Sequence, residues 1–227
     1  MGSSYAIKKI NFGTGVFCYL VEIKKTAEFR NSNEILNKQE TKIAQYLSGR
    51  RKTEWICGRI AAKSAVCKAL SASGFELNLN EIVINSGNDR KPEYRAKIKS
   101  PKMHISISHC KNAAVAVCSG MPVGIDIETP RKFSASLLSR AISPDDCIGI
   151  SKRKKDIYYT SIWCVKEAAS KAMGLGMKLD FRKIKVGNKK NGSFVVAEWK
   201  KRRLVFDAKI KMLKNNIIAL CVLKNEK

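Results

Sequence analysis

The sequence predicts an α+β protein made of two similar α+β halves, residues 1–120 and 121–227. In the first half, segments with apolar residues three and four positions apart, which are typical of helices, come before short apolar segments typical of strands. The second half begins with a strand, Val123–Glu128, and continues with helices and then further strands. The apolar runs Ala114–Cys118 and Ile217–Val222 hold matching places, each ending its half. The break at Gly120-Met121-Pro122 separates the halves, so a duplication is the simplest architecture that fits.

In the first half, apolar periodicity predicts two helices, Asn33–Leu47 and Arg51–Leu70, which the Ser48-Gly49 break separates. After Gly74 the period changes to alternating or continuous apolar residues, as strands require. The expected strands are Ile82–Asn85, Ala96–Lys99, Met103–Ser108 and Ala113–Cys118.

In the second half, helices are expected over Ala135–Ile142 and Lys154–Met173, where the apolar spacing is again three and four. Apolar segments bounded by turn residues predict the strands. These strands are Val123–Glu128, Lys183–Val186, Phe194–Trp199, Leu204–Met212 and Ile217–Leu223.

The composition is strongly basic, with 44 Lys and Arg against 19 Asp and Glu and a net charge of +25. Such a surface attracts nucleic acid, a nucleotide with several phosphates or an acidic protein, although it can also be an ordinary solvated surface. The longest apolar run, Ile217–Leu223, is far shorter than a membrane helix, so no membrane association is expected. The first residues lack the regions of a signal peptide, so we expect a cytoplasmic protein. We expect a monomer, because two fused halves have their own interface.

The eight cysteines are even in number, as in a disulfide-bonded protein, but they include no CxxC pair. Several of them lie inside apolar periodic segments. We therefore expect reduced cysteines that act as small buried apolar residues rather than disulfides or zinc ligands.

An acidic motif lies in the predicted strand Gly124-Ile125-Asp126-Ile127-Glu128. Residues two apart in a strand share a face, so Asp126 and Glu128 present two carboxylates side by side while Ile125 and Ile127 face the core. Adjacent carboxylates repel each other, and binding Mg²⁺ together with substrate phosphates would relieve this repulsion. The alternative is an edge strand whose exposed face happens to be acidic.

A second motif lies in the predicted helix Lys154–Met173, where Trp163, Glu167 and Lys171 are four residues apart and share a face. Glu167 and Lys171 could form only a surface ion pair. However, small residues follow and lead into Gly174-Leu175-Gly176, and small residues allow a ligand or another backbone to approach closely.

Basic and hydroxyl-bearing residues in the first half are candidates for phosphate binding. His109 follows Ser106-Ile107-Ser108 at a strand end, where it can donate a hydrogen bond to phosphate. Arg51 lies near the start of a helix, a position that favours anions. Arg59 and Lys63 share a face of that helix, although solvated charges on an amphipathic helix would give the same pattern.

Taken in order, five motifs resemble those of the Sfp-type 4'-phosphopantetheinyl transferase superfamily. They are RxxEWxxGRxAAK from Arg51, KP at Lys91-Pro92, SISH ending at His109, GIDIE at residues 124–128, and WxxKEAxxKAxGxG from Trp163. The resemblance covers about Arg51 to Met177, and the last two motifs together are highly specific. It implies the pseudo-twofold fold of that superfamily, with the metal-site motifs in the half 121–227.

The resemblance also implies roles for individual residues. Asp126, Glu128 and Glu167 would surround one Mg²⁺ on the pyrophosphate of coenzyme A, and Lys171 would contact that pyrophosphate. The residues implied to bind the other phosphates of coenzyme A are Lys91, Ser108 and His109, with Arg51 as our candidate for the 3'-phosphate.

The implied enzyme is a holo-[acyl-carrier-protein] synthase or 4'-phosphopantetheinyl transferase that serves fatty-acid, polyketide or peptide synthesis. It would move the phosphopantetheine arm of its co-substrate coenzyme A to a serine of an acidic apo carrier protein and release 3',5'-ADP. Glu167 would be the catalytic base and Lys171 would offset charge. The alternative is a basic nucleic-acid-binding protein, but the sequence has no zinc-finger, RNP-like or helix-turn-helix motif, so we expect no specific nucleic acid.

Overall fold

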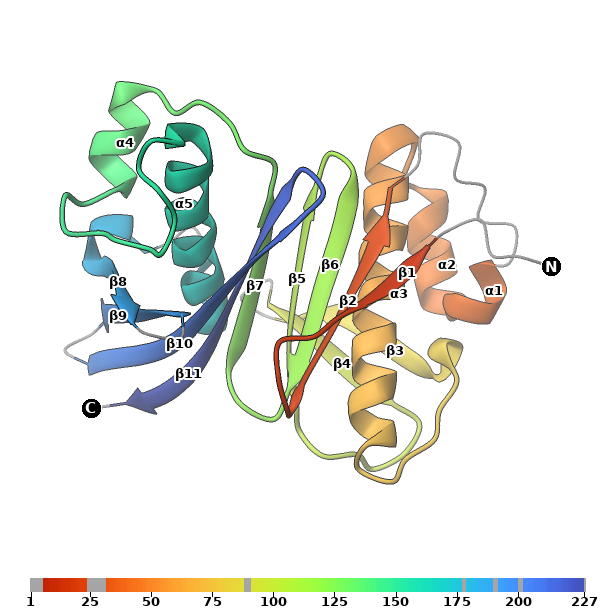
Figure 1. Cartoon of the computed structure of the whole chain (residues 1–227). Coiled ribbons are helices and arrows are strands. Elements are labelled where there is room, and N and C mark those ends of the chain that lie inside the picture. Colours follow the sequence, from red (N-terminus) through yellow and green to blue (C-terminus); the bar gives the residue numbers. More distant parts are fainter. Residues whose placement is uncertain are drawn as a thin grey trace. The chain divides into compact units, whose positions relative to one another are not determined.

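A computed structural model describes residues 6–23, 32–87, 91–176, 179–189, 192–199 and 202–226. Contacts within the chain divide it into two compact units, Met1–Gly120 and Met121–Lys227. Each unit combines helices with an antiparallel sheet (Figure 1), so the predicted α+β class is confirmed. The predicted duplication is consistent with this architecture.

Unit 1 is built on a four-stranded antiparallel sheet with the order β1-β2-β6-β5. Its strands are β1 (Ile7–Ile10), β2 (Val16–Glu22), β5 (His104–Cys110) and β6 (Ala113–Ser119), and β3 (Ile82–Ser86) pairs with β4 (Pro92–Ala96) as a separate two-stranded sheet. Its helices are α1 (Ser32–Ile35), α2 (Lys38–Gln45), α3 (Gly49–Ser71) and the short 3₁₀ helix η1 (Leu79–Glu81).

The core of unit 1 lies between α3 and the sheet. Ile56 and Ile60 of α3 are buried in one apolar cluster with Ala114 and Ala116 of β6. Small side chains on the sheet allow the long helix to lie close to it, and burial of this apolar surface is the main stabilising contribution. Because the apolar face of α3 is packed against the sheet, the positions of its polar side chains are also fixed.

Two sequence predictions for unit 1 were wrong in detail, and two of its strands were missed. The predicted helix Asn33–Leu47 is split, because the side chain of Asn37 accepts a hydrogen bond from the backbone N–H of Glu40 and starts α2 with a capping box. The strand predicted at Ala96–Lys99 is instead β4, which starts at Pro92, a residue that strands tolerate at their first position. Strands β1 and β2 were not predicted.

Unit 2 is built on a five-stranded antiparallel sheet with the order β7-β11-β10-β9-β8. Its strands are β7 (Val123–Glu128), β8 (Ile184–Lys189), β9 (Gly192–Trp199), β10 (Arg202–Leu213) and β11 (Asn216–Glu226). Its helices are α4 (Ala135–Ala141), α5 (Lys155–Ala172) and the 3₁₀ helix η3 (Phe181–Lys183). Every element predicted for this half is present with small shifts of its ends.

In unit 2, α5 lies against the sheet (Figure 1). Ile162, Val165 and Ala169 of α5 are buried in one cluster with Ala219 and Cys221 of β11. The helix therefore packs directly over the strand that pairs with β7, and this packing brings the acidic strand and the helix motif into one neighbourhood.

The eight cysteines all lie in the described part of the chain and are free thiols. Five are buried, namely Cys18, Cys57, Cys118, Cys164 and Cys221. Burial raises the pKa of the Cys57 and Cys118 thiols to about 12, so these residues behave as apolar side chains, as predicted. Among the described helices, none has both the length and the apolar composition needed to cross a bilayer.

Candidate active site

The site is formed where β7 touches the backbone of α5. A Cβ atom at Gly124 would lie 1.9 Å from the carbonyl oxygen of Ala168 and 2.5 Å from the backbone nitrogen of Ala172. Only glycine permits an approach this close. Because side chains alternate along a strand, Asp126 and Glu128 leave β7 on the same face as Gly124, the face that α5 covers.

We predict that Gly124→Ala destabilises the protein by about 1–3 kcal/mol or more, because the added methyl group would overlap backbone atoms that cannot move aside easily. Urea unfolding measures this change. Gly120→Ala is the matched control, since a Cβ there meets nothing within 4 Å. Equal stability of the two variants would contradict the close contact between β7 and α5.

Asp126, Glu167 and Lys171, all predicted from the sequence, are brought together in unit 2. The ammonium nitrogen of Lys171 lies 2.5 Å from Oδ1 of Asp126 and 3.4 Å from Oε2 of Glu167. Asp126 is 2% exposed, whereas the side chains of Glu167 and Lys171 are 17% and 25% exposed. The prediction that Glu167 and Lys171 form more than a surface pair is therefore consistent with the geometry.

Burial and neighbouring carboxylates raise the pKa of both glutamates of the site, Glu167 and Glu128. Burial, and then the nearby charge of Asp126, raise the pKa of Glu167 to about 7, with Lys171 opposing the shift. Burial and Asp126 also raise the pKa of Glu128, and Arg131 and Lys171 oppose this rise. The side chains of Ile125 and Ile127 leave β7 on the opposite face and are buried. Three acidic groups are thus crowded where a cation would be stabilised.

The residues fit Mg²⁺ chemically, although a metal ion would require some rearrangement. Carboxylate oxygens are the ligands this ion prefers. Within the described residues, no three His, Cys, Asp or Glu side chains stand in a metal-binding arrangement. The cation between Asp126 and Glu167 is instead the ammonium group of Lys171. This flexible side chain is partly exposed, so it can move aside for a divalent ion.

The stability of the metal-free protein should report the crowding of these carboxylates. The pKa of Glu167 in the folded protein, about 7, is higher than its ordinary value of 4.5, so the folded state binds more protons between these values. This group's contribution therefore makes the free energy of unfolding fall as pH rises from about 4.5 to about 7. Glu167→Gln has no carboxylate at this position and therefore lacks this pH dependence. Urea unfolding in the presence of a chelator should show that the free energy of unfolding of the variant, minus that of wild type, rises between about pH 4.5 and about pH 7. If the difference in free energy of unfolding between the variant and wild type stayed constant over this pH range, the raised pKa of Glu167 would be contradicted.

The four residues proposed to bind coenzyme A phosphates all belong to unit 1. Arg51 and His109 are exposed, and Nδ1 of His109 lies 3.9 Å from Oε2 of Glu54 in α3. Ser108 is 8% exposed, and its side chain leaves β5 on the face opposite to that of His109. The structure therefore favours His109 over Ser108 as a side-chain donor to an external phosphate.

Lys91 lines a pocket of about 460 Å³ in unit 1, together with residues that the sequence analysis did not select. Tyr94, Lys102 and His104 are among its lining residues. Burial, followed by the charges of Lys91 and Lys102, lowers the pKa of His104. Two lysines at one pocket favour an anionic ligand. The sequence held a signal for this pocket: His104 alternates with the apolar residue Ile105, which predicts that the two side chains leave the strand on opposite faces.

Lys63 and Arg59, further candidates for phosphate binding, are engaged inside unit 1. Lys63 is fully buried, forms an ion pair with Glu40, and its ammonium group donates to the carbonyl oxygen of Ile35 at 2.6 Å. The guanidinium group of Arg59 lies 4.5 Å from the ring centre of Trp55 and 3.9 Å from Glu40. The interpretation of Lys63 as a phosphate ligand was wrong, since a fully buried ammonium group cannot meet an external ligand.

Comparison with known proteins identifies the family. The model of the 4'-phosphopantetheinyl transferase superfamily matches residues 122–221, which lie in unit 2. A holo-[acyl-carrier-protein] synthase of Geobacillus sp. (strain WCH70) is 32% identical over 108 residues, which are 45% of this chain and 91% of that protein. A 4'-phosphopantetheinyl transferase of Bacillus pumilus is 27% identical over 106 residues, which are 45% of this chain and 44% of that protein.

A crystal structure of the Bacillus anthracis str. Ames holo-(acyl-carrier-protein) synthase, in complex with CoA (3',5'-ADP), is 29% identical and has a TM-score of 0.40. The match covers 46% of this chain and 92% of the Bacillus anthracis chain. The sequence relatives place the protein among the transferases. The chain belongs to the 4'-phosphopantetheinyl transferase superfamily. It is an enzyme of that class, which transfers phosphopantetheine, as the sequence motifs predicted.

Proposed function

We propose that this enzyme transfers the 4'-phosphopantetheine group of coenzyme A to a serine of an apo carrier protein in a magnesium-dependent reaction that releases 3',5'-ADP. The observation that carries the proposal is the cluster of Asp126, Glu167 and Lys171 in unit 2, which places two carboxylates and an ammonium group together. The reacting diphosphate is heavily anionic, so cations and a base are the groups that the reaction requires.

In this proposal Asp126, Glu128 and Glu167 hold Mg²⁺, which when bound offsets the negative charge of the pyrophosphate. Glu167 also accepts the proton of the carrier serine hydroxyl, directly or through water. Its place in the cluster, beside Lys171 and partly exposed, supports this role, because a base must reach the hydroxyl group whose proton it takes. Lys171, whose ammonium group is already at the cluster, contacts the pyrophosphate.

Arg51, Lys91, Ser108 and His109 of unit 1 are proposed to bind the remaining phosphates of coenzyme A. The exposure of Arg51 and His109 and the basic pocket beside Lys91 support this assignment, and Ser108 has the least support because it is nearly buried. The carrier is proposed to be acidic. A net charge of +25 would attract such a partner and speed its encounter with the enzyme.

Mass spectrometry tests the proposal. The purified protein is incubated with Mg²⁺, coenzyme A and a panel of acyl, polyketide and peptidyl apo carriers. At least one carrier should gain the mass of one phosphopantetheine arm, and a chelator should prevent the gain. No gain on any carrier would refute the proposed reaction, and a gain that persists without divalent ions would refute its magnesium dependence.

A further inference from the structure

Among the described residues, two lysines are fully buried, one on the long helix of each unit. Lys63 of α3 and Lys166 of α5 each have a side-chain exposure of 0% and form an ion pair with a buried carboxylate. Lysine is almost never fully buried without such a partner. From the sequence, Lys63 was a candidate for phosphate binding, and neither ion pair was predicted.

In unit 1 the carboxylate of Glu40 has three kinds of partner besides the guanidinium group of Arg59, which lies 3.9 Å away. It pairs with Lys63, accepts the backbone N–H of Asn37 at 3.1 Å, and accepts the backbone N–H of Ile84 at 3.1 Å. The Lys63 ammonium group also donates to the carbonyl oxygen of Ile35. This network ties α3 to the start of α2 and to β3.

In unit 2 the carboxylate of Asp146 has the same three kinds of partner. Its Oδ2 atom lies 2.5 Å from the Lys166 ammonium nitrogen and 2.7 Å from the backbone nitrogen of Ser143, and its Oδ1 atom accepts the N–H of Val186 at 2.9 Å. The Lys166 ammonium group also donates to the carbonyl oxygen of Ala141 at 2.9 Å. This network ties α5 to the end of α4 and to β8.

The two networks correspond position by position. In each unit the carboxylate accepts the amide three residues before it and the amide of the third residue in the strand that follows the long helix. In each unit the lysine donates to the carbonyl group five residues before the carboxylate. A repeat this specific supports the predicted duplication. It also supplies an internal control, because only one of the two lysines adjoins the site.

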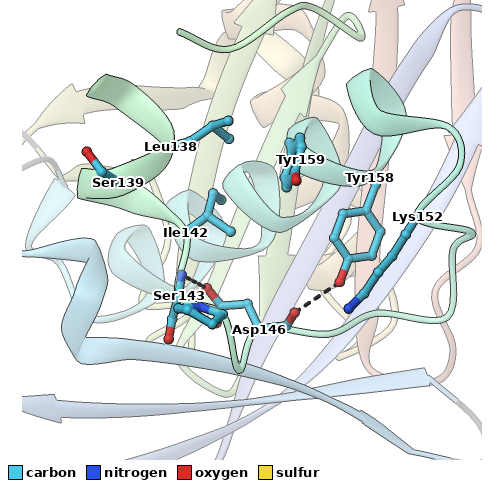
Figure 2. Close-up of a pocket in the computed structure, with 9 residues that line it drawn as sticks. Leu138, Ser139, Ile142, Ser143, Asp146, Lys152, Tyr158 and Tyr159 are labelled. Carbon is cyan, nitrogen blue, oxygen red and sulfur yellow. Dashed lines mark hydrogen bonds between the residues drawn. The ribbon is translucent and has the colours of Figure 1, made fainter. Parts of the chain in front are cut away.

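The carboxylate in unit 2 is held by further contacts. Asp146 lines a pocket of about 360 Å³ together with residues of α4 and α5. Dashed lines in Figure 2 join Asp146 to the backbone nitrogen of Ser143 and to the hydroxyl group of Tyr158. The Tyr158 hydroxyl group donates to the carbonyl oxygen of Asp146 at 3.0 Å. The Lys166 ammonium group makes one more hydrogen bond, to the carbonyl oxygen of Phe181 at 3.1 Å. Asp146 is therefore a fixed point to which α5 is anchored.

Three consecutive residues of α5 connect this anchor to the site. Successive residues of a helix point about 100° apart. Lys166 is bound to Asp146, and the backbone at Ala168 lies against Gly124 of β7. Glu167 lies between them, so contacts on both sides fix the rotation of the helix at the residue that must face Asp126.

We propose that Lys166, held by Asp146, is a positioning residue for the transfer reaction, because it fixes the rotation of α5 so that Glu167 and Lys171 stay beside Asp126. The proposal rests on the proposed function of Glu167. Lys166 itself touches no substrate. Its loss would displace the catalytic groups, and a displacement of about 1 Å can lower a rate about 10²-fold.

The test compares Lys166→Met with Lys63→Met, which removes the corresponding lysine from unit 1. Both variants leave a buried carboxylate without its ammonium partner, so both should lower the urea midpoint. Under conditions where both are folded, Lys166→Met should lower kcat about 10²-fold with KM for coenzyme A changed by less than about 3-fold. Lys63→Met should keep kcat within about 3-fold of wild type, because Glu167 is not in its unit.

Two further measurements separate positioning from stability. Mn²⁺ binding, followed by electron paramagnetic resonance without coenzyme A, should be weakened about 10-fold or more in Lys166→Met and unchanged in Lys63→Met. In the double variant Lys166→Met with Asp146→Asn, removal of the uncompensated charge should restore part of the stability. The kcat of this double variant should stay low. Recovery of kcat together with stability would show a purely structural role and overturn the proposal.

Two outcomes distinguish this proposal from the proposed function. If Lys166→Met keeps wild-type kcat and Mn²⁺ affinity while wild type transfers phosphopantetheine, the positioning role is refuted and the proposed function stands. If wild type modifies no carrier, the proposed function itself fails. If Lys166→Met does not fold, Asp146→Asn replaces it, because this variant retains the Lys166 bonds to Ala141 and Phe181. Wild-type kcat in that variant would refute the role equally.

Discussion

Glu167→Gln is expected to lower kcat for phosphopantetheine transfer by about 10²–10⁴-fold, the contribution typical of a general base. Glutamine has nearly the same shape but cannot accept the proton of the carrier serine, and it supplies no negative charge to a divalent ion. Its neutral side chain also relieves the repulsion that Asp126 exerts on Glu167, so at pH 8 without metal the variant should be at least as stable as wild type.

Steady-state kinetics with a carrier that wild type modifies, together with urea unfolding, measure both effects. Glu198→Gln is the control, because Glu198 is an exposed residue of β9 in the same unit and the substitution removes the same charge. This control should keep wild-type kcat. A Glu167→Gln variant that retains more than about a tenth of the wild-type kcat would remove Glu167 from the proposed mechanism.

Lys171→Met is expected to lower kcat about 10²-fold, since it removes a cation that offsets charge on the pyrophosphate. It should also destabilise the metal-free protein by about 1–3 kcal/mol, because Asp126 and Glu167 lose the ammonium group between them. This loss of stability should be smaller than the largest losses measured when a fully buried ion pair is broken, because the Lys171 side chain is 25% exposed.

Added Mg²⁺ should raise the melting temperature of Lys171→Met more than that of wild type, because in wild type the ion must displace an ammonium group. Thermal unfolding with and without Mg²⁺ measures this difference. Lys185→Met, at an exposed lysine of β8, serves as the control and should respond to Mg²⁺ as wild type does. If Mg²⁺ raised the melting temperatures of Lys171→Met and wild type equally, the ion and the ammonium group would not occupy the same position between the carboxylates.

The sequence predicted unit 2 well because its elements are long and strongly periodic. Spacing predicted that Glu167 and Lys171 share a helix face, and alternation predicted that Asp126 faces away from Ile125. That the three groups meet, as they do in the structure, was implied only by the resemblance to the superfamily. What the sequence could not predict was that the lysine would stand between the two carboxylates. That arrangement depends on the close contact of β7 with α5 at Gly124, which is a tertiary feature.

Unit 1 was predicted less well, for two different reasons. The signals for its first sheet strands were present, since the run Val16–Val21 is apolar and follows the turn at Gly13 and Gly15, both of which have positive φ. Similarly, Asn37 and Glu40 have the spacing of a capping box. The buried pair of Lys63 with Glu40 had no such signal, because a lysine on an amphipathic helix is normally solvated and its partner lies 23 residues away.

A crystal structure with Mn²⁺ and coenzyme A would show whether Asp126, Glu128 and Glu167 bind one divalent ion. We expect an anomalous peak within about 2.5 Å of carboxylate oxygens of both Asp126 and Glu167, with Lys171 moved toward the pyrophosphate. A peak elsewhere, or coenzyme A bound with no metal at these carboxylates, would refute this magnesium site.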